Sequence, residues 1–325
     1  MSTTEQARPI IELADLTRVF RRRAAGLRRG ELLTAVDRMS FAIQPGESVG
    51  YIGANGAGKS TTIKMLTGIL RPTSGSVRTC GLDPMRQRKD VARRVGVVFG
   101  QRSQLWWDLP LHESLTILGA IHGMSDAAVR SRAATLVEQL EMAGTLDTAV
   151  RQLSLGQRMR AEIAAALMHS PHLLILDEPT IGLDVLSKQR LREFLRRERA
   201  ERGTTLLLTT HDMGDIERLC DRVLVVDRGR LAFDGTLTGL GETVGARRVL
   251  VLDLASPTEP LHGIRDTTLL AVEGDGLRQR LAFDASATTA AKVLAEVSAR
   301  AQVLDLAIEE PDIEDVVRRI YSATR

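Results

Sequence analysis

The periodicity of apolar residues changes several times along the chain, and each change marks an expected element. Residues 10–20 and 33–43 show partial alternation of apolar and polar positions, which predicts two strands of an antiparallel hairpin layer. Other apolar runs are short and continuous, as in strands that are buried on both faces. These runs lie at residues 48–52, 95–99, 173–177 and 205–211.

Between the expected strands, apolar residues recur at three- and four-residue intervals, which predicts helices. The helical stretches are residues 62–66, 111–124, 126–142 and 186–201. Ser125 is the expected N-cap of the third stretch, residues 72–75 are expected to form a turn, and residues 223–226 and 231–233 a hairpin. Strands that alternate with helices predict an α/β fold with a mainly parallel sheet, interrupted by a helical insertion at about residues 102–169.

Past residue 245 the pattern becomes that of a small α+β domain. The expected strands are residues 247–254, 268–273, 277–283 and 303–308, and the expected helices are residues 288–301 and 312–321. We therefore predict one domain over residues 8–240 and a small accessory domain over residues 245–325, in which no catalytic motif is visible.

Composition narrows the class of protein. The chain has 325 residues, 43% of them hydrophobic, and a formal net charge of +3, which suits a globular protein of about two domains. No apolar run approaches the ~20 residues of a membrane-spanning helix, and no apolar stretch of a signal peptide follows the polar residues 1–9. We therefore expect residence in the cytosol and reduced, structural cysteines at Cys80 and Cys220. Because acidic and basic residues nearly cancel, no nucleic-acid partner is expected.

One stretch carries a specific chemistry. Residues 53–61, GANGAGKST, follow an expected strand and precede an expected helix, which is the context of a phosphate-binding P-loop. Gly56 and Gly58 let the backbone approach phosphate, while N–H groups at the helix start point at the anion. Lys59 can reach the β- and γ-phosphates, and the Ser60 hydroxyl can bind Mg²⁺. The alternative is a glycine-rich turn that binds nothing. The residues expected to bind phosphate are Gly53, Ala54, Asn55, Gly56, Ala57, Gly58, Lys59, Ser60 and Thr61.

Further polar stretches follow the P-loop in a definite order. Gln101 closes the strand at 95–99, residues 153–158 (LSLGQR) open a helix, and Asp177 and Glu178 end the strand at 173–177. The run IGLD at residues 181–184 comes next, and His211 ends the following strand. Taken singly, an acidic pair is often a solvated helix start and a lone histidine is often structural.

Taken together, these motifs resemble those of the ATP-binding cassette (ABC) ATPases over residues 10–236. The resemblance implies that the chain binds ATP with Mg²⁺ and hydrolyses it. It makes Glu178 the catalytic base, places His211 on the γ-phosphate, and gives Mg²⁺ the ligands Ser60, Gln101 and Asp177.

The remaining roles implied by the resemblance concern the base and a second copy of the chain. Phe20 matches the aromatic residue that stacks on adenine, although it is also compatible with a core position at a strand end. Ser154, Gly156 and Gln157 match the signature that binds the γ-phosphate held by another copy, so that ATP lies in a dimer; Asp184 is assigned to the same site. The usual Gly-Gly of the signature is Leu155-Gly156 here, which departs from the family pattern.

The function implied by the resemblance is that of an ATP-hydrolysing subunit, peripheral on the cytoplasmic face of the membrane, that drives a separate permease. The signature, residues 178–184 and the tail at 309–311 resemble bacterial exporters of drugs and lipid-linked compounds. An importer ATPase with a regulatory tail and a soluble ABC ATPase acting on DNA or ribosomes are the alternatives. Trp106 and Trp107 fit either core packing or a partner surface, and the Arg-rich residues 21–30 either a solvated loop or a contact with anionic lipid.

Overall fold

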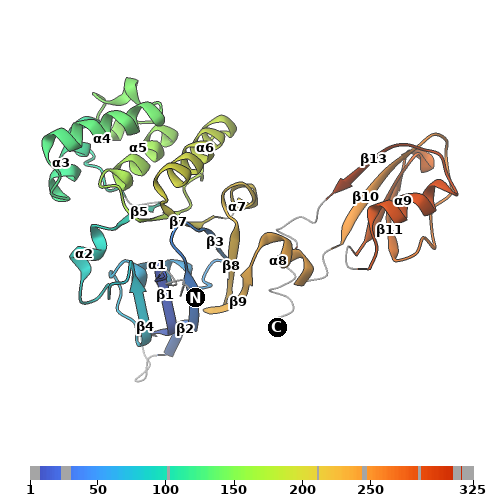
Figure 1. Cartoon of the computed structure of the whole chain (residues 1–325), viewed down its shortest axis with the longest axis horizontal. Helices are drawn as coiled ribbons and strands as arrows, with labels where there is room; N and C mark the ends of the chain where they lie inside the picture. Colours follow the sequence, from blue (N-terminus) through green and yellow to red (C-terminus); the bar gives the residue numbers. More distant parts are fainter. Residues whose placement is uncertain are drawn as a thin grey trace, which may run out of the picture. The chain divides into compact units, whose positions relative to one another are not determined.

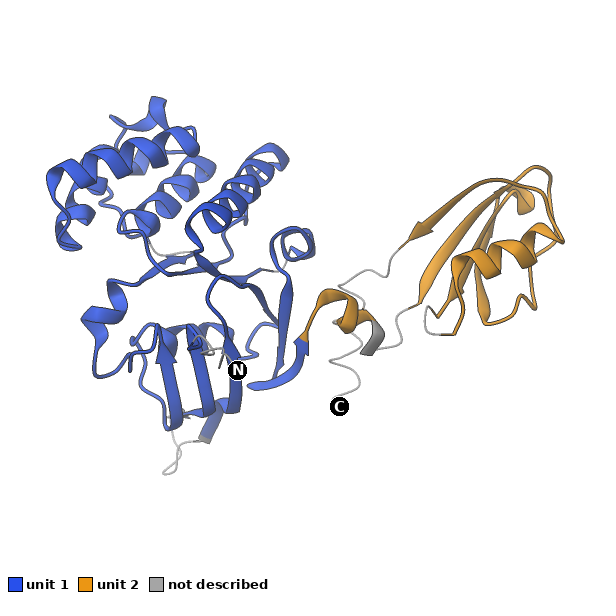
Figure 2. Cartoon of the chain, in the orientation of Figure 1, with its two compact units in different colours: residues 1–234 blue, residues 235–325 orange. Residues whose placement is uncertain are grey.

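The computed structural model describes residues 8–22, 31–100, 103–210, 212–243, 247–284, 287–309 and 316. The chain divides into two compact units, residues 1–234 and 235–325 (Figure 2). This division falls a few residues before the boundary at 240–245 that the sequence predicts, because the strand ending at Gly235 completes the larger sheet of the first unit.

The first unit contains an antiparallel sheet in the order β2-β1-β4. Its strands are β1 (Ile11–Arg22), β2 (Glu31–Ile43) and β4 (Ser74–Thr79). The predicted hairpin of β1 and β2 is confirmed, with Ile11 opposite Ile43. Most of the Arg-rich segment at 21–30 lies outside the described residues.

Strand β4 corrects the turn that the sequence predicts at residues 72–75. It is polar, and only Val77 and Thr79 are buried, so it lacks the apolar alternation that signals a strand. Gly75 has φ of 79°, and a Cβ built there would lie 2.3 Å from the Asp15 carbonyl oxygen. The glycine is therefore needed for the close approach of β4 to β1.

A larger, mainly parallel sheet has the order β5-β6-β7-β3-β8-β9. Its strands are β3 (Ser48–Gly53), β5 (Val95–Phe99), β6 (Leu173–Asp177), β7 (Thr205–Thr209), β8 (Arg222–Asp227) and β9 (Arg230–Gly235). Parallel pairing joins β5 to β6, β6 to β7, β7 to β3 and β3 to β8, as predicted. Every residue of β3 and β7 is buried, which explains the uninterrupted apolar runs. Arg228 and Gly229 both have positive φ in the tight turn between β8 and β9.

Helix α1 (Lys59–Leu66) connects the two sheets of this unit. It contacts β2, β3 and β4, and its residues Ile63 and Met65 belong to one buried cluster with Leu13 of β1 and Ile175 of β6. The carboxyl end of β3 is thereby fixed against both sheets, and this end carries the P-loop.

The predicted helical insertion is present (Figure 1). Its longer helices are α3 (Leu111–Ile121), α4 (Asp126–Gln139) and α5 (Leu155–Leu167), and short 3₁₀ turns occupy Ala143–Thr145 and Val150–Gln152. Ser125 caps α4 by accepting from the Ala128 N–H, as the sequence predicts. The unit also contains α2 (Arg88–Ala92), α6 (Val185–Arg202) and α7 (Met213–Leu219), of which only α6 was predicted.

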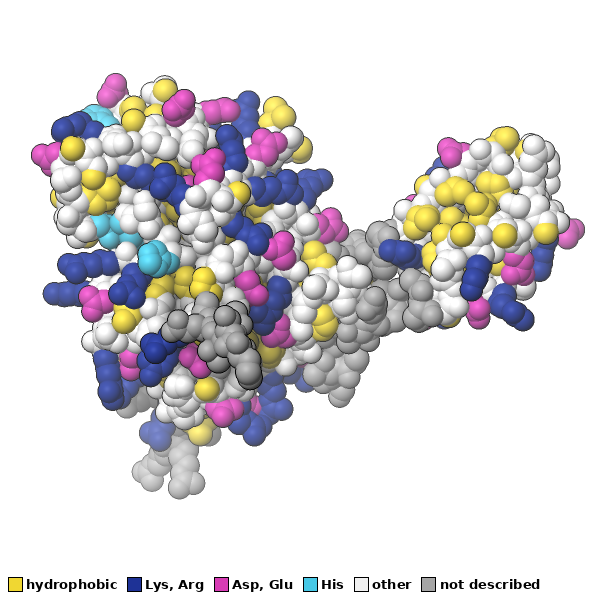
Figure 3. All heavy atoms as spheres, in the orientation of Figure 1, with side chains coloured by type: hydrophobic (Ala, Val, Ile, Leu, Met, Phe, Trp, Pro, Cys, Tyr) yellow, Lys and Arg dark blue, Asp and Glu magenta, His cyan; other side chains and the backbone are white. Residues whose placement is uncertain are grey.

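The second unit is a small α+β body with an antiparallel sheet in the order β11-β12-β10-β13. Its elements are α8 (Leu237–Thr243), β10 (Arg248–Leu254), β11 (Thr267–Glu273), β12 (Arg278–Phe283), α9 (Ala290–Ser298) and β13 (Val303–Glu309), with a 3₁₀ turn at Gly274–Gly276. Leu250, Phe283 and Val297 form part of a core between the sheet and α9. Hydrophobic side chains also gather on the outside of this unit (Figure 3). Apart from Val316, the predicted helix at 312–321 lies outside the described residues.

Candidate functional site: a nucleotide cavity at the P-loop

The P-loop connects Gly53, the last residue of β3, to Lys59, the first residue of α1. Gly56 and Gly58 have φ of 83° and 103°, a region that favours glycine. A Cβ at Gly58 would lie 2.4 Å from the Ala35 carbonyl oxygen, whereas a Cβ at Gly56 would meet open space. Gly58 is therefore required by conformation and by packing on β2, and Gly56 by conformation alone.

Lys59 is almost completely buried at the start of α1. Its ammonium group donates to the carbonyl oxygens of Gly53 and, at 3.3 Å, of Ala54. Burial lowers the Lys59 pKa, and the negative charges of Glu178 and Asp177 oppose this effect. A cation held in this way favours an anionic ligand, because phosphate oxygens replace the solvation that burial removes.

A cavity of about 790 Å³ opens over the P-loop. Residues 54–61 line one side, and Asp177 and Glu178 at the end of β6 line another. Phe20 lines the cavity from β1, is half-buried, and has the Arg18 guanidinium 4.6 Å from its ring centre. The volume is that of a small-molecule site, and cationic, acidic and aromatic groups converge on it. Phe20 lies at this cavity and outside the buried core cluster of its unit.

The acidic pair is held by the neighbouring strand β7. Asp177 pairs in register with Thr209, whose hydroxyl donates to the Asp177 carboxylate. The Glu178 N–H donates to the Thr209 carbonyl oxygen at 2.9 Å. Glu178 has φ of 56°, which is strained for a residue with a side chain. Such strain persists only where the surroundings enforce it. Here the hydrogen bond to β7 holds the Glu178 backbone in place, and Glu178 lines the cavity.

A buried ionic network lies behind the acidic pair, and no sequence motif predicted it. Asp215 of α7 is fully buried and accepts hydrogen bonds from Arg192 of α6, from Thr180 and, at 3.4 Å, from Thr210. Thr180 follows Glu178 by two residues, and Thr210 directly follows the last residue of β7. Asp215 thus connects both segments to α6. No helix was predicted from the sequence at Met213–Leu219, so the position of Asp215 beside α6 was not foreseen.

We expect Asp215→Ala to lower the free energy of unfolding by about 3 kcal/mol, because it leaves the Arg192 guanidinium buried without its nearest carboxylate. Urea denaturation followed by circular dichroism measures this change. The matched control is Asp221→Ala, which removes the exposed partner of Arg199 and is expected to cost less than about 1 kcal/mol. Equal losses in the two variants would contradict a stabilising role for the buried network.

The signature residues do not line the nucleotide cavity of their own chain. Ser154 is the N-cap of α5: its hydroxyl accepts from the Gln157 N–H at 3.3 Å, and the Gln157 side chain accepts from the Ser154 N–H at 2.9 Å. This reciprocal cap fixes the backbone at the start of α5, where the first N–H groups of a helix lack partners within the helix. A Cβ at Gly156 would meet only ordinary contacts with Leu183 and Ser187.

Leu155, which departs from the family pattern, contacts Gly182. Gly182 has φ of 71°, and a Cβ built there would lie 2.4 Å from the Leu155 Cδ2 atom. The Leu155 side chain therefore packs against Gly182, whose positive φ favours glycine. Asp184, two residues on, is the N-cap of α6, and hydrogen bonds from the hydroxyl and N–H of Ser187 lower its carboxyl pKa. It too does not line the nucleotide cavity of its own chain.

Two residues expected at the site, Gln101 and His211, lie outside the described residues. Their neighbours Gly100 and Thr210 are described: Gly100 lines the nucleotide cavity, and Thr210 belongs to the Asp215 network. Within the described part of the chain, no group of three or more His, Cys, Asp or Glu side chains could hold a metal ion by itself.

Comparison with known proteins decides the family. Residues 36–181 match the family described as ABC transporter. The linearmycin resistance ATP-binding protein LnrL of Bacillus subtilis is 32% identical over 303 residues, which cover 90% of this chain and 94% of that protein. This chain belongs to the ABC transporter ATP-binding proteins. The resemblance predicted from the sequence is therefore confirmed.

Other relatives and solved structures agree with this family. The Nod factor export ATP-binding protein I of Paraburkholderia xenovorans is 44% identical over 208 residues, covering 64% of this chain and 67% of that protein. A solved ATP-binding subunit of an ABC transporter superposes with a TM-score of 0.63 at 28% identity, covering 73% of this chain and 94% of that one. A dimeric, post-hydrolysis ATP-binding cassette bound to ADP and phosphate gives a TM-score of 0.62 at 26% identity, covering 70% and 98%. This ABC ATPase thus has the predicted fold class, and it binds and hydrolyses ATP.

Proposed function

We propose that this ABC ATPase drives a separate membrane permease that exports amphipathic or drug-like compounds. The observation that carries the proposal is the similarity over nearly the whole chain to a protein named for linearmycin resistance, together with the similarity to Nod factor export proteins. Among the described residues, no helix combines the length and apolar character needed to cross a bilayer. The names of the similar transport proteins support a separate membrane subunit that supplies the path for the cargo.

The residues at the nucleotide cavity divide the chemistry among them. Lys59 and the P-loop N–H groups bind and orient the phosphates, and Phe20 stacks on the base. Glu178 accepts a proton from the attacking water, for which its position beside the P-loop is suited. Asp177, oriented by the Thr209 hydroxyl, presents a carboxylate to the same space. His211 and Gln101 are assigned to the γ-phosphate and the metal by the family pattern.

The donors at the cavity also fit Mg²⁺. The Ser60 hydroxyl and the Asp177 carboxylate both line it, and hard oxygen ligands in small number suit this ion. Bound Mg²⁺ neutralises charge on the phosphate oxygens. Ser60, Asp177 and Gln101 would hold it, while Lys59 remains responsible for the direct contact with phosphate.

A second copy of the chain would complete each site. The signature lies outside the nucleotide cavity of its own chain and forms the capped N-terminus of α5. A helix N-terminus suits a phosphate group, which another copy would supply. Leu155, Ile181, Val185 and Leu186 are exposed apolar residues of the signature and of residues 181–186, and Ile181 also lines the cavity. Exposed apolar side chains of this kind are expected at an interface. Dimeric cassettes among the similar structures support this arrangement.

Trp106 and Trp107 support a docking surface for the permease. They are 37% and 49% exposed, which favours a partner surface over core packing, and the Arg158 guanidinium lies 5.5 Å from the Trp107 ring centre. The segment that carries them follows Gly100 of the nucleotide cavity by only a few residues. Partly exposed aromatic side chains dominate the energetics of many interfaces, so nucleotide binding and permease contact would share this segment.

The test is recovery of the ATPase with its permease from detergent-extracted native membranes. A tagged chain is expected to bring down a polytopic membrane protein in stoichiometric amount, which mass spectrometry identifies. Trp106→Ser/Trp107→Ser is expected to lower the recovered permease at least tenfold, while ATP binding in solution is unchanged. The matched control is Ile121→Ser, an exposed apolar residue at the end of α3. If no membrane protein is recovered with the tagged chain, the transport role is refuted. If the Trp variant recovers as much permease as the original chain, only the docking surface is refuted.

A further inference from the structure

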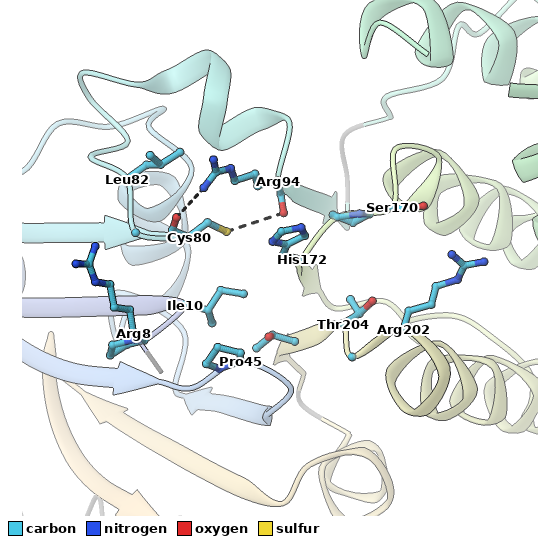
Figure 4. A pocket seen from close by; sticks show the side chains of 15 residues that line it. Arg8, Ile10, Pro45, Cys80, Leu82, Arg94, Ser170, His172, Arg202 and Thr204 are labelled. Atoms are coloured by element: carbon cyan, nitrogen blue, oxygen red, sulfur yellow. Dashed lines mark hydrogen bonds between the residues drawn. The ribbon is translucent and has the colours of Figure 1, made fainter. Parts of the chain in front are cut away.

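A second large cavity lies at the amino ends of the strands whose carboxyl ends carry the nucleotide site. Its volume is about 860 Å³, comparable to that of the nucleotide cavity. Figure 4 shows the side chains that line it, contributed by the segments that precede β1, β5, β6 and β7 and by the turn after β4. Its lining includes Arg8, Ile10, Arg94, His172, Arg202 and Thr204.

The same strands lead from this cavity to the nucleotide. Arg94 immediately precedes β5, which ends at Phe99 on the nucleotide cavity. His172 precedes β6, which ends at the acidic pair. Thr204 precedes β7, whose last residue donates to Asp177. Each of these strands has five residues and is largely buried, so the two cavities are connected by short, well-packed elements.

The charge of this second cavity is strongly unbalanced. Arg8, Arg94 and Arg202 line it, and none of its described lining residues is acidic. Arg94 donates to the Cys80 carbonyl oxygen at 3.2 Å, which fixes its guanidinium at the wall. Arg202 contacts Glu198 at 3.4 Å, but that carboxylate is also bound by Arg132 at 2.8 Å. The counterion of Arg202 is therefore shared with a second arginine, while Arg8 and Arg94 have no acidic neighbour among the lining residues.

The remaining lining is mixed in character. Ile10 and Pro171 provide buried apolar surface, and Thr204, which is also buried, carries a hydroxyl. Guanidinium groups bind carboxylates and phosphates through paired hydrogen bonds, so arginines on separate parts of the wall suit an organic anion with more than one charge. The cavity is too large for a simple inorganic ion to fill.

We propose that this cavity binds a small organic polyanion carrying two or more carboxylate or phosphate groups, and that its occupancy changes the affinity of the nucleotide cavity for ATP. The proposal does not depend on the direction of transport or on the identity of the permease. Linkage requires the effect to be reciprocal, so ATP binding would change the affinity for the polyanion by the same factor.

Binding is tested by calorimetric titration of the Lys59→Ala chain in Mg²⁺-free buffer, in which the P-loop competes least for anions. Citrate and pyrophosphate are the probes for carboxylate and phosphate ligands, and acetate is the monovalent comparison. We expect one site per chain for citrate, for pyrophosphate or for both, and no measurable binding of acetate. Tighter binding of citrate would point to a polycarboxylate ligand, and tighter binding of pyrophosphate to a phosphorylated one.

Variants place that binding in the cavity. Adding Arg94→Gln is expected to weaken binding at least about tenfold through loss of charge-assisted hydrogen bonds. Adding His172→Trp, which fills the cavity without removing an arginine, should weaken it similarly. The matched control is Arg86→Gln, whose side chain is 87% exposed and does not line the cavity. Failure of both polyanions to bind, or unchanged affinity in both cavity variants, would overturn the proposed site.

Coupling is tested on the chain with an intact P-loop. Saturating polyanion is expected to change the ATP affinity at least threefold. In His172→Trp, which blocks the second cavity, the polyanion is expected to leave the ATP affinity unchanged apart from any direct competition at the P-loop. Direct competition at the P-loop would persist in His172→Trp, so an equal effect in both chains would overturn the coupling. If neither the original chain nor His172→Trp binds ATP, the nucleotide site is refuted, and this result differs from failure of the coupling.

Discussion

Glu178→Gln is expected to lower steady-state ATP hydrolysis at least ~100-fold while ATP affinity stays within a few-fold of the original chain. The substitution keeps the shape and hydrogen-bonding capacity of the side chain but removes the carboxylate that accepts the proton from water. The backbone hydrogen bond from the Glu178 N–H to Thr209 does not involve the side chain, so the local geometry is retained. Phosphate release and equilibrium ATP binding measure the two quantities separately.

The matched control for this prediction is Glu201→Gln, which makes the same chemical change at an exposed position of α6. It is expected to leave turnover within about twofold. Near-normal turnover in Glu178→Gln would show that Glu178 is not the base. A parallel loss of ATP affinity would show that the Glu178 side chain acts in binding. The strained backbone, with φ of 56°, would then position a binding group and not a base.

Ser154→Arg is expected to abolish hydrolysis while a single chain still binds ATP. In the proposed dimer, the long cationic side chain occupies the space of a phosphate oxygen bound to the other copy. Lys59 and Ser60, which hold the nucleotide, lie in the other half of the composite site and are untouched. Because Ser154 is also the N-cap of α5, the variant loses about 1 kcal/mol of helix stability as well. Ser154→Ala loses the same cap without the bulk, and is therefore the matched control for the steric effect.

Mixing two inactive chains sharpens this test. Lys59→Ala weakens nucleotide binding at the P-loop, and Ser154→Arg blocks the signature. In a mixed dimer one composite site carries both lesions and the other carries neither. The mixture is expected to recover part of the activity that both parents lack. Full activity of Ser154→Arg by itself would end the two-copy account.

Most of the fold was predictable because buried parallel strands and amphipathic helices leave strong periodic signals. The runs at β3, β6 and β7 were read as strands from their continuous apolar residues, and Ser125 was read as a cap from its position between two helical patterns. The P-loop was predictable for a different reason: its glycines, lysine and serine occur at fixed spacing in a strand-to-helix turn, and the structure shows why Gly58 admits no other residue.

The features that the sequence did not predict are those that depend on contacts with distant parts of the chain. Strand β4 is polar because β1 supplies its pairing and only two of its side chains face the core. The Asp215 network combines residues from α6, α7 and two loops, and no local pattern announces such a set. The packing of Leu155 on Gly182 likewise joins two motifs that are separate in sequence. Tertiary contacts of this kind override local propensity, so they require the structure.

The most direct test of the account is the molar mass of the Glu178→Gln chain, measured by light scattering with and without ATP and Mg²⁺. A chain that binds ATP at its own P-loop and cannot hydrolyse it should be trapped against the signature of a second copy. We expect a monomer without nucleotide, a dimer with ATP, and a monomer again when Ser154→Arg is added. An ATP-bound chain that remains a monomer, with nucleotide occupancy shown in the same sample, would contradict it.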